Sequence, residues 1–583
     1  MSIRTTALFA LILLVLGGYF YLFEVRKVKL DEEREARETR LLKASKEAIE
    51  EIKLKWQGEE VVVKKEGDQW KIIQPLEIMA DQKAAESIIS ALDRSKIERV
   101  IEKNPSKLDD FGLAQPALEV SLNIKNASPE IVLIGQANPT QSFIYAKKGE
   151  SPEVFLTSFS LKSDLDKKLY DLRDKTALDV SFEQVKTIEL HHQAESITLT
   201  AGDGGVWTLS HPLRDRVDVD KVRQLVTKIR HAKIKEFFDG EQPDLASAGL
   251  TRPSSIALHL KEGEVTKTLL IGAIDEEKNG IYAKRDGEEK LFLLEKSLVS
   301  DLFPKIDDLR DKKLFTFENT KIEKIEINSE GTEITLSRIG DEQWEIMKPI
   351  TARADRRVVD NFLASIKGMK IDEFLPLSSE PQAGFHSPTI EIKLLEQGGE
   401  LSRSLSIGGE IEGKEQMYGW LSDREGIFAL PKWAVSELKK SPADFIDKRI
   451  LSFKNDDVEE IDLKQNGQSF HLEKEKREWK AIKPEKAKVK EAKVRSFLWD
   501  LNDLEYKERI SEKPSEGKEY RFDQPTVEIT LLKKGREAIM ELLIVSDAKD
   551  GEKAYAKMKK DQTIYAIDPK FLTKIPKGLD DLK

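Results

Sequence analysis

The sequence predicts an α+β fold built from four tandem homologous domains, each with a mostly antiparallel sheet and packed helices, preceded by one N-terminal transmembrane helix. Three observations lead to this prediction. A Trp-x4-Pro motif occurs four times at nearly constant spacing, similar strand-like and helix-like patterns surround each occurrence, and an uncharged apolar stretch lies near the start of the chain. The length of 583 residues is itself more than one hydrophobic core normally serves.

The first segment in chain order is the predicted membrane anchor. Residues 1–6 form a short cytoplasmic n-region, residues 7–23 carry no charge, and residues 24–43 form a charged juxtamembrane segment. An apolar helix over 7–23 reaches roughly 26 Å, and Tyr19 and Tyr21 lie near one end as interfacial aromatics do. A cleaved signal peptide would require small residues after the apolar run, and a lipoprotein would require a cysteine. Neither feature follows residues 7–23 in this sequence. We therefore expect an uncleaved signal-anchor.

The orientation of this anchor follows from its layout. Arg4 flanks one side and Arg26, Lys27 and Lys29 flank the other, so a count of positive charges slightly favours the reverse orientation. The order of n-region and apolar region is nevertheless that of a signal sequence. We therefore expect a single-pass membrane protein whose N-terminus lies inside and whose remaining chain lies in the extracytoplasmic space.

The repeats follow the anchor. Their tryptophans are separated by 137, 137 and 135 residues, a period typical of tandem domains and too long for a solenoid turn. The motif residues are Trp70, Trp207, Trp344 and Trp479, with Pro75, Pro212, Pro349 and Pro484. The predicted domains are residues 44–177, 178–315, 316–451 and 452–583, the last of them degenerate.

Strands are predicted before each tryptophan. Ile52 and Leu54 of the first domain have apolar equivalents at the same alternating spacing in the other three. Period-two spacing predicts a strand with one buried face. A second strand and a turn follow, which places the Trp on a hairpin, and the Pro ends its strand because it cannot donate to a ladder.

A helix comes next. Asp81, Asp218 and Asp355 stand six residues past the Pro and are predicted N-caps, whereas Lys490 in the fourth domain predicts a weaker helix start. An apolar stripe with helical spacing follows in every domain. Its members are Ala85, Ile88, Ile89 and Leu92, then Val222, Leu225, Val226 and Ile229, then Val359, Phe362, Leu363 and Ile366, and finally Val494, Phe497, Leu498 and Leu501.

Two further motifs complete each domain. A Gly-Leu-x-x-Pro-like string begins at Gly112, Gly249 and Gly384. Because glycine adopts backbone angles that other residues resist, Arg521 at this place puts the tight turn in doubt for the fourth domain. Later strands carry an Ile-Gly pair in three domains and a tyrosine in all four, at Tyr145, Tyr282, Tyr418 and Tyr555. A short helix with Asp-Leu-Arg-Asp-Lys or a related string closes each domain.

The repeated side chains have two interpretations, functional and structural. Each Trp could stack on a sugar or a peptide, but packing against the Pro and the helix is favoured. Asp218 and Asp220 are interpreted as an acidic helix start rather than calcium ligands. The closing charged strings are interpreted as charge pairs at domain junctions. These residues are therefore predicted structural anchors.

No reactive constellation is visible in the sequence. The seven histidines form no repeated set, and the adjacent His191 and His192 face opposite sides of a strand. H-E-x-x-H, P-loop, G-x-S-x-G and G-x-G-x-x-G motifs do not occur. A chain without cysteine has no disulfide, thiol nucleophile or Cys-ligated metal. We therefore predict no catalytic, cofactor-binding or metal-binding residues.

Two observations bear on partners. The net charge of −10, with acids and bases interspersed, excludes the basic stripe of a general nucleic-acid binder. Trp420, Trp433 and Trp499 are additional aromatics confined to the third and fourth domains, and they mark the first place to look for a surface specialised for a partner.

The repeated motifs resemble those of a known bacterial family. The set Trp-x4-Pro, Ala/Val-Asp, Gly-Leu-x-x-Pro, Ile-Gly and Leu-Arg-Asp-Lys is similar to that of domain of unknown function 4340, over essentially the whole chain after about residue 44. The resemblance implies an N-terminal anchor. It also implies an extracytoplasmic accessory role beside ABC-type transporter subunits, including gliding-motility-associated transport systems.

Three functions are weighed on this basis. The favoured one is a non-enzymatic, membrane-anchored extracytoplasmic scaffold or accessory subunit of an ABC-type transport or envelope system, presenting its domains as a semi-rigid rod. The alternative is a multivalent envelope glycan- or peptide-binding protein, which requires accessible tryptophans. A hydrolase using scattered acids is disfavoured, because four similar scaffolds without a retained reactive set are typical of binding and spacing proteins.

Overall fold

The structure is a computed structural model. It describes Tyr19, Tyr21 and residues 39–149, 151–261, 264–340, 343–398, 402–465, 467–476, 478–511, 520–546 and 553–583. The predicted transmembrane segment 7–23 lies, apart from the two tyrosines, outside the described residues. Within the described ranges, no helix combines the length and apolarity needed to cross a bilayer.

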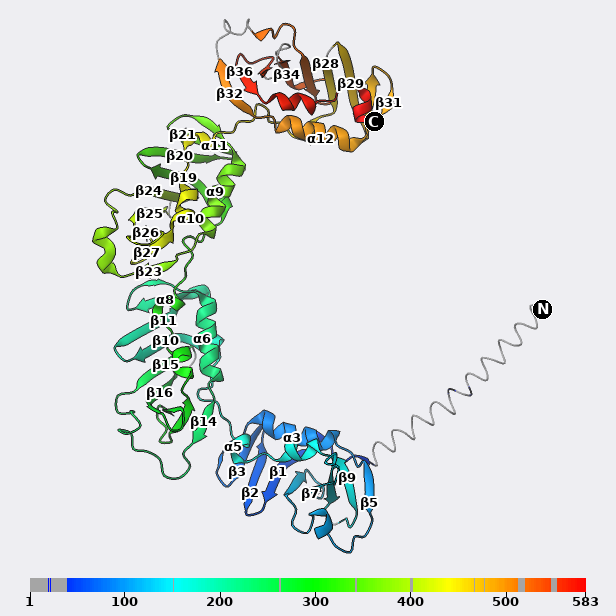
Figure 1. Cartoon of the computed structure of the whole chain (residues 1–583), viewed down its shortest axis with the longest axis vertical. Coiled ribbons are helices and arrows are strands. Elements are labelled where there is room, and N and C mark those ends of the chain that lie inside the picture. Colours follow the sequence, from blue (N-terminus) through cyan, green and yellow to red (C-terminus); the bar gives the residue numbers. More distant parts are fainter. Residues whose placement is uncertain are drawn as a thin grey trace, which may run out of the picture. The chain divides into compact units, whose positions relative to one another are not determined.

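Four nine-stranded sheets make up the described chain, and they share one strand order (Figure 1). In the first domain this order is β4-β3-β2-β1-β6-β7-β8-β9-β5, and the strand pairs with a described register are antiparallel. The predicted four domains with antiparallel sheets are confirmed. The predicted α+β balance is corrected, because each domain is mostly β and carries few helices. Nine strands form each sheet, whereas the first domain has one helix longer than six residues.

The elements of the first two domains correspond one to one. The first domain contains β1 (Ile49–Trp56), β2 (Glu59–Glu66), β3 (Gln69–Gln74), β4 (Ile78–Met79), α3 (Gln82–Arg94), β5 (Arg99–Glu102), β6 (Leu118–Ile124), β7 (Glu130–Ala137), β8 (Phe143–Lys148), β9 (Val154–Ser158), α4 (Ser160–Leu165) and α5 (Leu169–Leu172). The second contains β10 (Val185–His192), β11 (Glu195–Ala201), β12 (Trp207–His211), β13 (Asp215–Arg216), α6 (Val219–His231), β14 (Ile234–Phe237), β15 (Ser254–Leu260), β16 (Thr266–Asp275), β17 (Gly280–Arg285), β18 (Phe292–Glu295), α7 (Leu298–Leu302) and α8 (Ile306–Leu309).

The third and fourth domains repeat this order, with 3-10 turns replacing the closing helices of the fourth. The third contains β19 (Ile322–Ser329), β20 (Thr332–Ile339), β21 (Gln343–Lys348), β22 (Ala352–Ala354), α9 (Arg356–Gly368), β23 (Glu373–Leu375), β24 (Ile390–Glu396), β25 (Ser402–Glu410), β26 (Gln416–Leu421), β27 (Ile427–Pro431), α10 (Lys432–Leu438) and α11 (Pro442–Phe445). The fourth contains β28 (Glu460–Gln465), β29 (Gln468–Glu475), β30 (Glu478–Lys483), β31 (Ala487–Lys488), α12 (Glu491–Asn502), β32 (Tyr506–Ser511), β33 (Val527–Leu532), β34 (Ala538–Ser546), β35 (Ala554–Met558), β36 (Ile564–Ile567), and turns at Pro569–Thr573 and Leu579–Leu582.

The long helix of each domain runs along its sheet and buries one face (Figure 1). All sixteen residues of the predicted apolar stripe are buried in α3, α6, α9 and α12, so that prediction is confirmed. Each fully buried aliphatic or aromatic side chain stabilises the fold by roughly 1.5–3 kcal/mol relative to an exposed one. The stripe therefore fixes how each helix sits on its sheet.

Three of the hydrophobic cores include residues that precede the first strand of their domain. Leu41 and Leu42 belong to the first core, Leu314 and Phe315 to the third, and Leu451 to the fourth. These residues lie in the segment that precedes the first strand of their domain. The backbone of that segment forms hydrogen bonds with residues just after the long helix of the same domain. In the third domain, for example, Leu314 N donates to Met369 O at 3.4 Å. Residues just before the predicted starts at 44, 316 and 452 thus pack into the core of the domain that follows them.

The chain divides into two compact units. The first comprises residues 1–207 and 219–304, and the second comprises residues 208–218 and 305–583. Every side-chain contact between successive domains that is described below lies inside one of these units.

Candidate functional site

The four repeated tryptophans are buried. They lie on β3, β12, β21 and β30, with exposures of 2% for Trp70, 3% for Trp207, 1% for Trp344 and 5% for Trp479. Cations lie over two of the rings, with Arg338 at 4.6 Å from the centroid of Trp344. Rings that are at most 5% exposed offer little surface on which a sugar or a peptide could stack.

The prolines and aspartates frame the turn between the Trp strand and the helix. Pro75, Pro212, Pro349 and Pro484 directly follow the Trp strands, and all four peptide bonds before them are cis. Asp81 accepts from Ala84 N at 3.1 Å and Asp355 from Arg357 N at 2.8 Å, while Asp218 directly precedes α6. Lys490 makes no side-chain cap, as expected of the weaker start.

Asp355 is more than a backbone cap. Its carboxylate also accepts from Arg357 Nη2 at 3.1 Å. Burial raises the pKa of Asp355, but hydrogen bonds from Arg357 outweigh burial and hold that pKa below its usual value. The charged carboxylate is therefore the form that the folded third domain favours.

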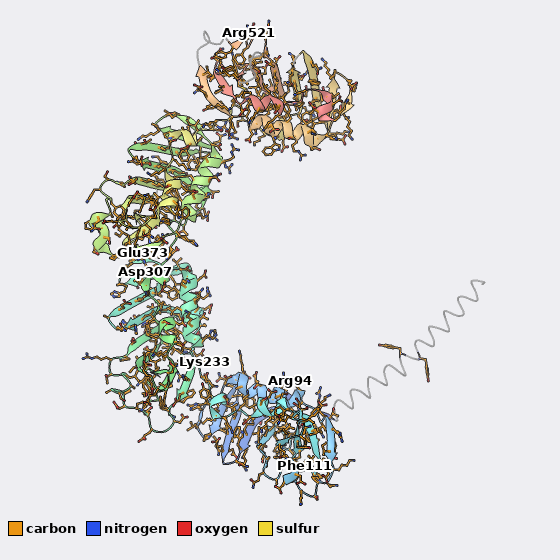
Figure 2. The ribbon with its side chains drawn as sticks, viewed as in Figure 1. Arg94, Phe111, Lys233, Asp307, Glu373 and Arg521 are labelled. Atoms are coloured by element: carbon orange, nitrogen blue, oxygen red, sulfur yellow. The ribbon has the colours of Figure 1, made fainter. Side chains whose placement is uncertain are left out.

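The Gly-Leu turn occurs in all four domains. Gly112, Gly249 and Gly384 have φ angles of 65°, 67° and 74°, and Arg521 adopts 53° at the equivalent place. Figure 2 labels Arg521 and also Phe111, which precedes the first glycine. The doubt that the sequence raised about the fourth turn is therefore corrected, because Arg521 adopts the left-handed backbone despite its side chain.

The Ile-Gly strand glycines allow this turn to approach the sheet. A Cβ on Gly135 would lie 2.2 Å from Phe111 O, and one on Gly272 would lie 2.0 Å from Ala248 O. In the third domain a Cβ on Gly408 would lie 1.8 Å from Ala383 O. The backbone of the turn thus touches the backbone of the strand, a contact that only glycine permits.

The repeated tyrosines pack beside the same turn. Tyr145 meets Phe111 edge-on at 5.1 Å, Tyr418 is buried beside Ala383, and Tyr555 meets Tyr520 at 4.6 Å. In the second domain the Tyr282 hydroxyl donates to Asp275 at 2.6 Å, and this hydrogen bond raises the pKa of Tyr282 to about 12. The tyrosines thus support the turn, and the high pKa keeps Tyr282 protonated at neutral pH.

At the first junction, between the first and second domains, the arginine of the closing Asp-Leu-Arg-Asp-Lys motif contacts the second domain. Arg173 forms an ion pair with Asp239 of the second domain, and its guanidinium carbon lies 3.6 Å from the ring centroid of Phe237. The Tyr170 hydroxyl donates to Ile234 O at 3.1 Å. A side chain at the end of one domain is therefore buried against the next.

The second junction contains a buried ion triad, which we define as Asp215, Arg310 and Arg424. Arg310 Nε lies 2.6 Å from Asp215 Oδ2, and Arg424 binds the same carboxylate through Nε at 2.8 Å and Nη2 at 2.7 Å. The side chains are 0%, 6% and 1% exposed in the order named. Both guanidinium groups also face Phe374, at 3.5 Å and 5.2 Å. Asp215 lies on β13 and Arg424 in the third domain, and all three residues of the ion triad belong to the second compact unit.

The third junction is more exposed. Asp447 binds Arg353 at 3.0 Å and Arg449 at 2.8 Å, whereas Arg357 reaches Asp503 and Glu505 of the fourth domain at 3.3 Å. Arg357 and its two distant partners are each about half exposed. Exposed pairs of this kind contribute little stability, so the third junction is held more weakly by charge than the second.

Sequence reasoning missed one polar cluster. The imidazole of His471 on β29 forms hydrogen bonds with Asp462 at 2.7 Å and with Glu473 at 2.8 Å. Glu460 Oε2 lies 3.8 Å from its Nε2. The strings Glu-x-Asp at 460 and His-x-Glu at 471 are the available signal, because alternate residues on paired strands share one face. This signal was overlooked because the histidines were compared between domains, and the other three domains have no histidine at the place of His471.

The additional tryptophans differ in exposure. Trp433 on α10 is 73% exposed and Trp499 on α12 is 62% exposed, while Trp420 is half-buried in a small cluster with Tyr418. Trp499 also lines an open groove with Phe453 and Arg495. Trp433 and Trp499 are therefore the aromatic side chains of the third and fourth domains that remain available to a partner.

Comparison with known proteins places the chain by its sequence. The sequence profile described as Domain of unknown function (DUF4340) matches residues 70–253, 207–388, 380–491 and 479–583. No curated protein and no solved structure gave a match. The repeated match extends from the first tryptophan motif to the last residue, and the chain accordingly belongs to the family of domain of unknown function 4340.

Proposed function

We propose that the chain is a non-enzymatic scaffold or accessory subunit of an ABC-type transport or envelope system. In this proposal residues 7–23 anchor it once in the bacterial inner membrane, and the four domains lie in the periplasm or extracytoplasmic space. Its partners are the membrane and a protein of the envelope, not nucleic acid. The membrane part rests on the sequence of the anchor, and the scaffold part rests on what the repeated side chains do.

The observation that supports a scaffold best is the buried ion triad. Two arginines and one aspartate are removed from water at a junction between domains, where desolvation is costly unless the groups stay paired. Flexibly linked domains would have no use for such an arrangement. A buried charge contact between residues 209 positions apart in the chain suits a protein with a structural task.

The repeated residues support the same proposal. The tryptophans, the capping aspartates and the glycine turns contribute to packing, helix starts and close backbone contacts. The alternative of a multivalent glycan- or peptide-binding protein depended on accessible tryptophans, and burial of the four repeated rings removes that basis. The scaffold proposal needs a contact surface instead, and the exposed Trp433 and Trp499 are its first candidates.

Photo-crosslinking in living cells tests the proposed partner. A photoreactive amino acid is placed at Trp433, at Trp499 and, as a matched control, at Val206, which is 62% exposed in the second domain. We expect crosslinks to a transporter permease or ATPase, or to another envelope protein, from one or both tryptophan positions and none from the control. Recovery of no membrane or envelope protein from either tryptophan position would contradict the proposal.

Protease accessibility tests the proposed side of the membrane. Added protease is expected to spare the domains in intact cells and degrade them once the outer permeability barrier is opened with the inner membrane left sealed. Degradation only after the inner membrane is lysed would place the domains in the cytoplasm. That result would contradict the localisation while leaving the crosslinking result interpretable.

A further inference from the structure

Four polar side chains meet on one face of the fourth sheet. Glu460 and Asp462 alternate on β28, and His471 and Glu473 alternate on β29. The two strands are antiparallel, with Glu460 opposite Glu473 and Asp462 opposite His471. Alternate residues of a strand point to one face, so all four side chains share the face opposite the helix-covered core.

The distances within this cluster are short. His471 Nδ1 lies 2.7 Å from Asp462 Oδ1, and Nε2 lies 2.8 Å from Glu473 Oε1 and 3.8 Å from Glu460 Oε2. The donor atoms of Glu460, His471 and Glu473 all lie within 4.8 Å of one another. The His471 side chain is 8% exposed, so it is held in place beneath the surface.

Asp462 gives this cluster the chemistry of a metal site. A carboxylate that accepts from Nδ1–H fixes the tautomer of an imidazole and leaves the Nε2 lone pair available to a metal ion. Nε2 faces Glu473 and Glu460, whose carboxylate oxygens are further ligands for such an ion. The four residues thus supply three donors and one orienting carboxylate.

The oxygen of Glu460 that faces the cluster is unusual. Glu460 Oε2 is buried and receives no hydrogen bond. Two basic side chains approach it, His471 with Nε2 at 3.8 Å and Arg536 with Nε at 3.4 Å, and the Arg536 side chain is 68% exposed. A buried carboxylate oxygen without a hydrogen bond is costly, and coordination to a cation would satisfy it.

We propose that Glu460, His471 and Glu473 form a binding site for a divalent transition-metal ion, with Zn²⁺ the ion that suits the donors best. A nitrogen donor combined with carboxylates favours zinc over magnesium or calcium, which prefer oxygen ligands alone. Three protein ligands leave a fourth position for water. When His471 is protonated, binding releases the Nε2 proton to solvent and the metal takes its place on the nitrogen.

The alternative to a bound metal ion is a protonated imidazole at His471. Burial lowers the pKa of His471, but hydrogen bonds to Glu473 and Asp462 outweigh burial and raise it overall. An imidazolium paired with carboxylates would account for the same distances without a metal. A direct measurement of bound metal separates the two occupants.

Other domains lack the equivalent histidine. The pair Asp462–His471 corresponds by register to Lys53–Val62, Glu189–Thr198 and Glu326–Thr335. The site is therefore specific to the fourth domain. The second domain offers a matched control, because His259 Nε2 lies 3.3 Å from Glu189 Oε1 on a sheet of the same type, and the described residues form no three-ligand group around it.

Equilibrium dialysis of the untagged full-length protein in detergent against Zn²⁺, followed by metal analysis, tests the site. We expect the wild type and His259→Gln to hold one more zinc ion per chain than His471→Gln. Glu473→Gln, which replaces a partly exposed ligand by a near-isosteric one, should weaken zinc binding at least tenfold. Asp462→Asn should weaken it about 10–100-fold through the lost orienting hydrogen bond.

Equal zinc content in the wild type, His471→Gln and Glu473→Gln would overturn the proposal and leave an ion-paired imidazolium. Circular dichroism checks the fold of each variant. If His471→Gln unfolds the fourth domain, Glu473→Gln alone decides the question. Substituting Co²⁺ for Zn²⁺ gives a second readout, since visible absorption should arise in the wild type and in His259→Gln but be lost in His471→Gln.

Discussion

Asp215→Ala would leave the guanidinium groups of Arg310 and Arg424 buried without a counter-ion. The structure gives the size of the effect, since one carboxylate accepts three hydrogen bonds of 2.6–2.8 Å from side chains that are at most 6% exposed. Breaking such a buried pair costs about 3–5 kcal/mol, because the remaining charge is uncompensated. That cost corresponds to roughly two to four powers of ten in a local opening equilibrium.

Native-state hydrogen exchange measures this opening. Four domains do not unfold as one two-state unit, so a local probe is needed. The amide of Asp218 donates to Leu309 O at 2.9 Å, and the amide of Asp311 donates to Arg216 O at 3.0 Å. Both hydrogen bonds lie next to the ion triad in sequence. We expect both amides to exchange about 10²–10⁴-fold faster in Asp215→Ala than in the wild type.

The matched control for this experiment is Asp307→Ala. Asp307 also pairs with Arg310, at 3.3 Å, but its side chain is 49% exposed. Solvent screens an exposed pair, so its loss should change exchange by less than about tenfold. Equal exchange in Asp215→Ala and Asp307→Ala would refute the argument that burial gives the ion triad its strength.

Three further changes should have separable effects. Trp344→Ala removes a ring that is 1% exposed and should destabilise the third domain by about 3–5 kcal/mol, whereas Trp433→Ala, at a 73% exposed ring, should stay within about 0.5 kcal/mol in thermal unfolding. Gly408→Ala places a Cβ 1.8 Å from a backbone carbonyl and should cost roughly 1–3 kcal/mol in urea unfolding, while Gly368→Ala meets no atom within 4 Å and should not destabilise. Because the folded-state pKa of Asp355 is lowered, its stabilisation is present above about pH 4 and is lost as pH falls through that pKa, so Asp355→Asn should flatten the acid limb of stability against pH.

Each of these predictions has a contrary outcome. Equal melting shifts for the two tryptophan variants would show that the repeated ring is not a core residue. Equal urea midpoints for the two alanine variants would show that the turn can move away from the strand at no cost. An unchanged acid limb in Asp355→Asn would show that this carboxylate is not the group that titrates there.

The elements that sequence could predict are those with local patterns. The apolar stripe of the long helices and the Trp hairpin follow from periodicity within a dozen residues, and the structure has them where expected. The two edge strands β4 and β5 have too few residues for a period to be recognised. The core role of Leu314 was hidden because its partner, Met369, lies beyond the helix of the next domain.

The charge contacts between distant residues could not be predicted from the sequence for a different reason. Residues such as Asp355 were predicted from caps and turns, which are local in sequence. Contacts that decide charge pairing are non-local, since Arg424 meets an aspartate 209 residues earlier. The acids around His471 were close in sequence, yet comparison between domains discarded the cluster because its histidine has no equivalent in the other three domains. Arg521 shows the opposite error, in which a residue preference was mistaken for a requirement.

The separation between Asp215 and Arg424 has a consequence for biosynthesis. Ribosomes add about 5–20 residues each second, so the carboxylate waits about 10–40 s for a guanidinium that is 209 residues downstream. Throughout that interval the nascent second domain must leave this edge of its sheet hydrated. The ion triad can therefore be completed only after this part of the third domain has been translated. A stalled or truncated message would release a second domain in which Asp215 lacks its hydrogen bonds from Arg424.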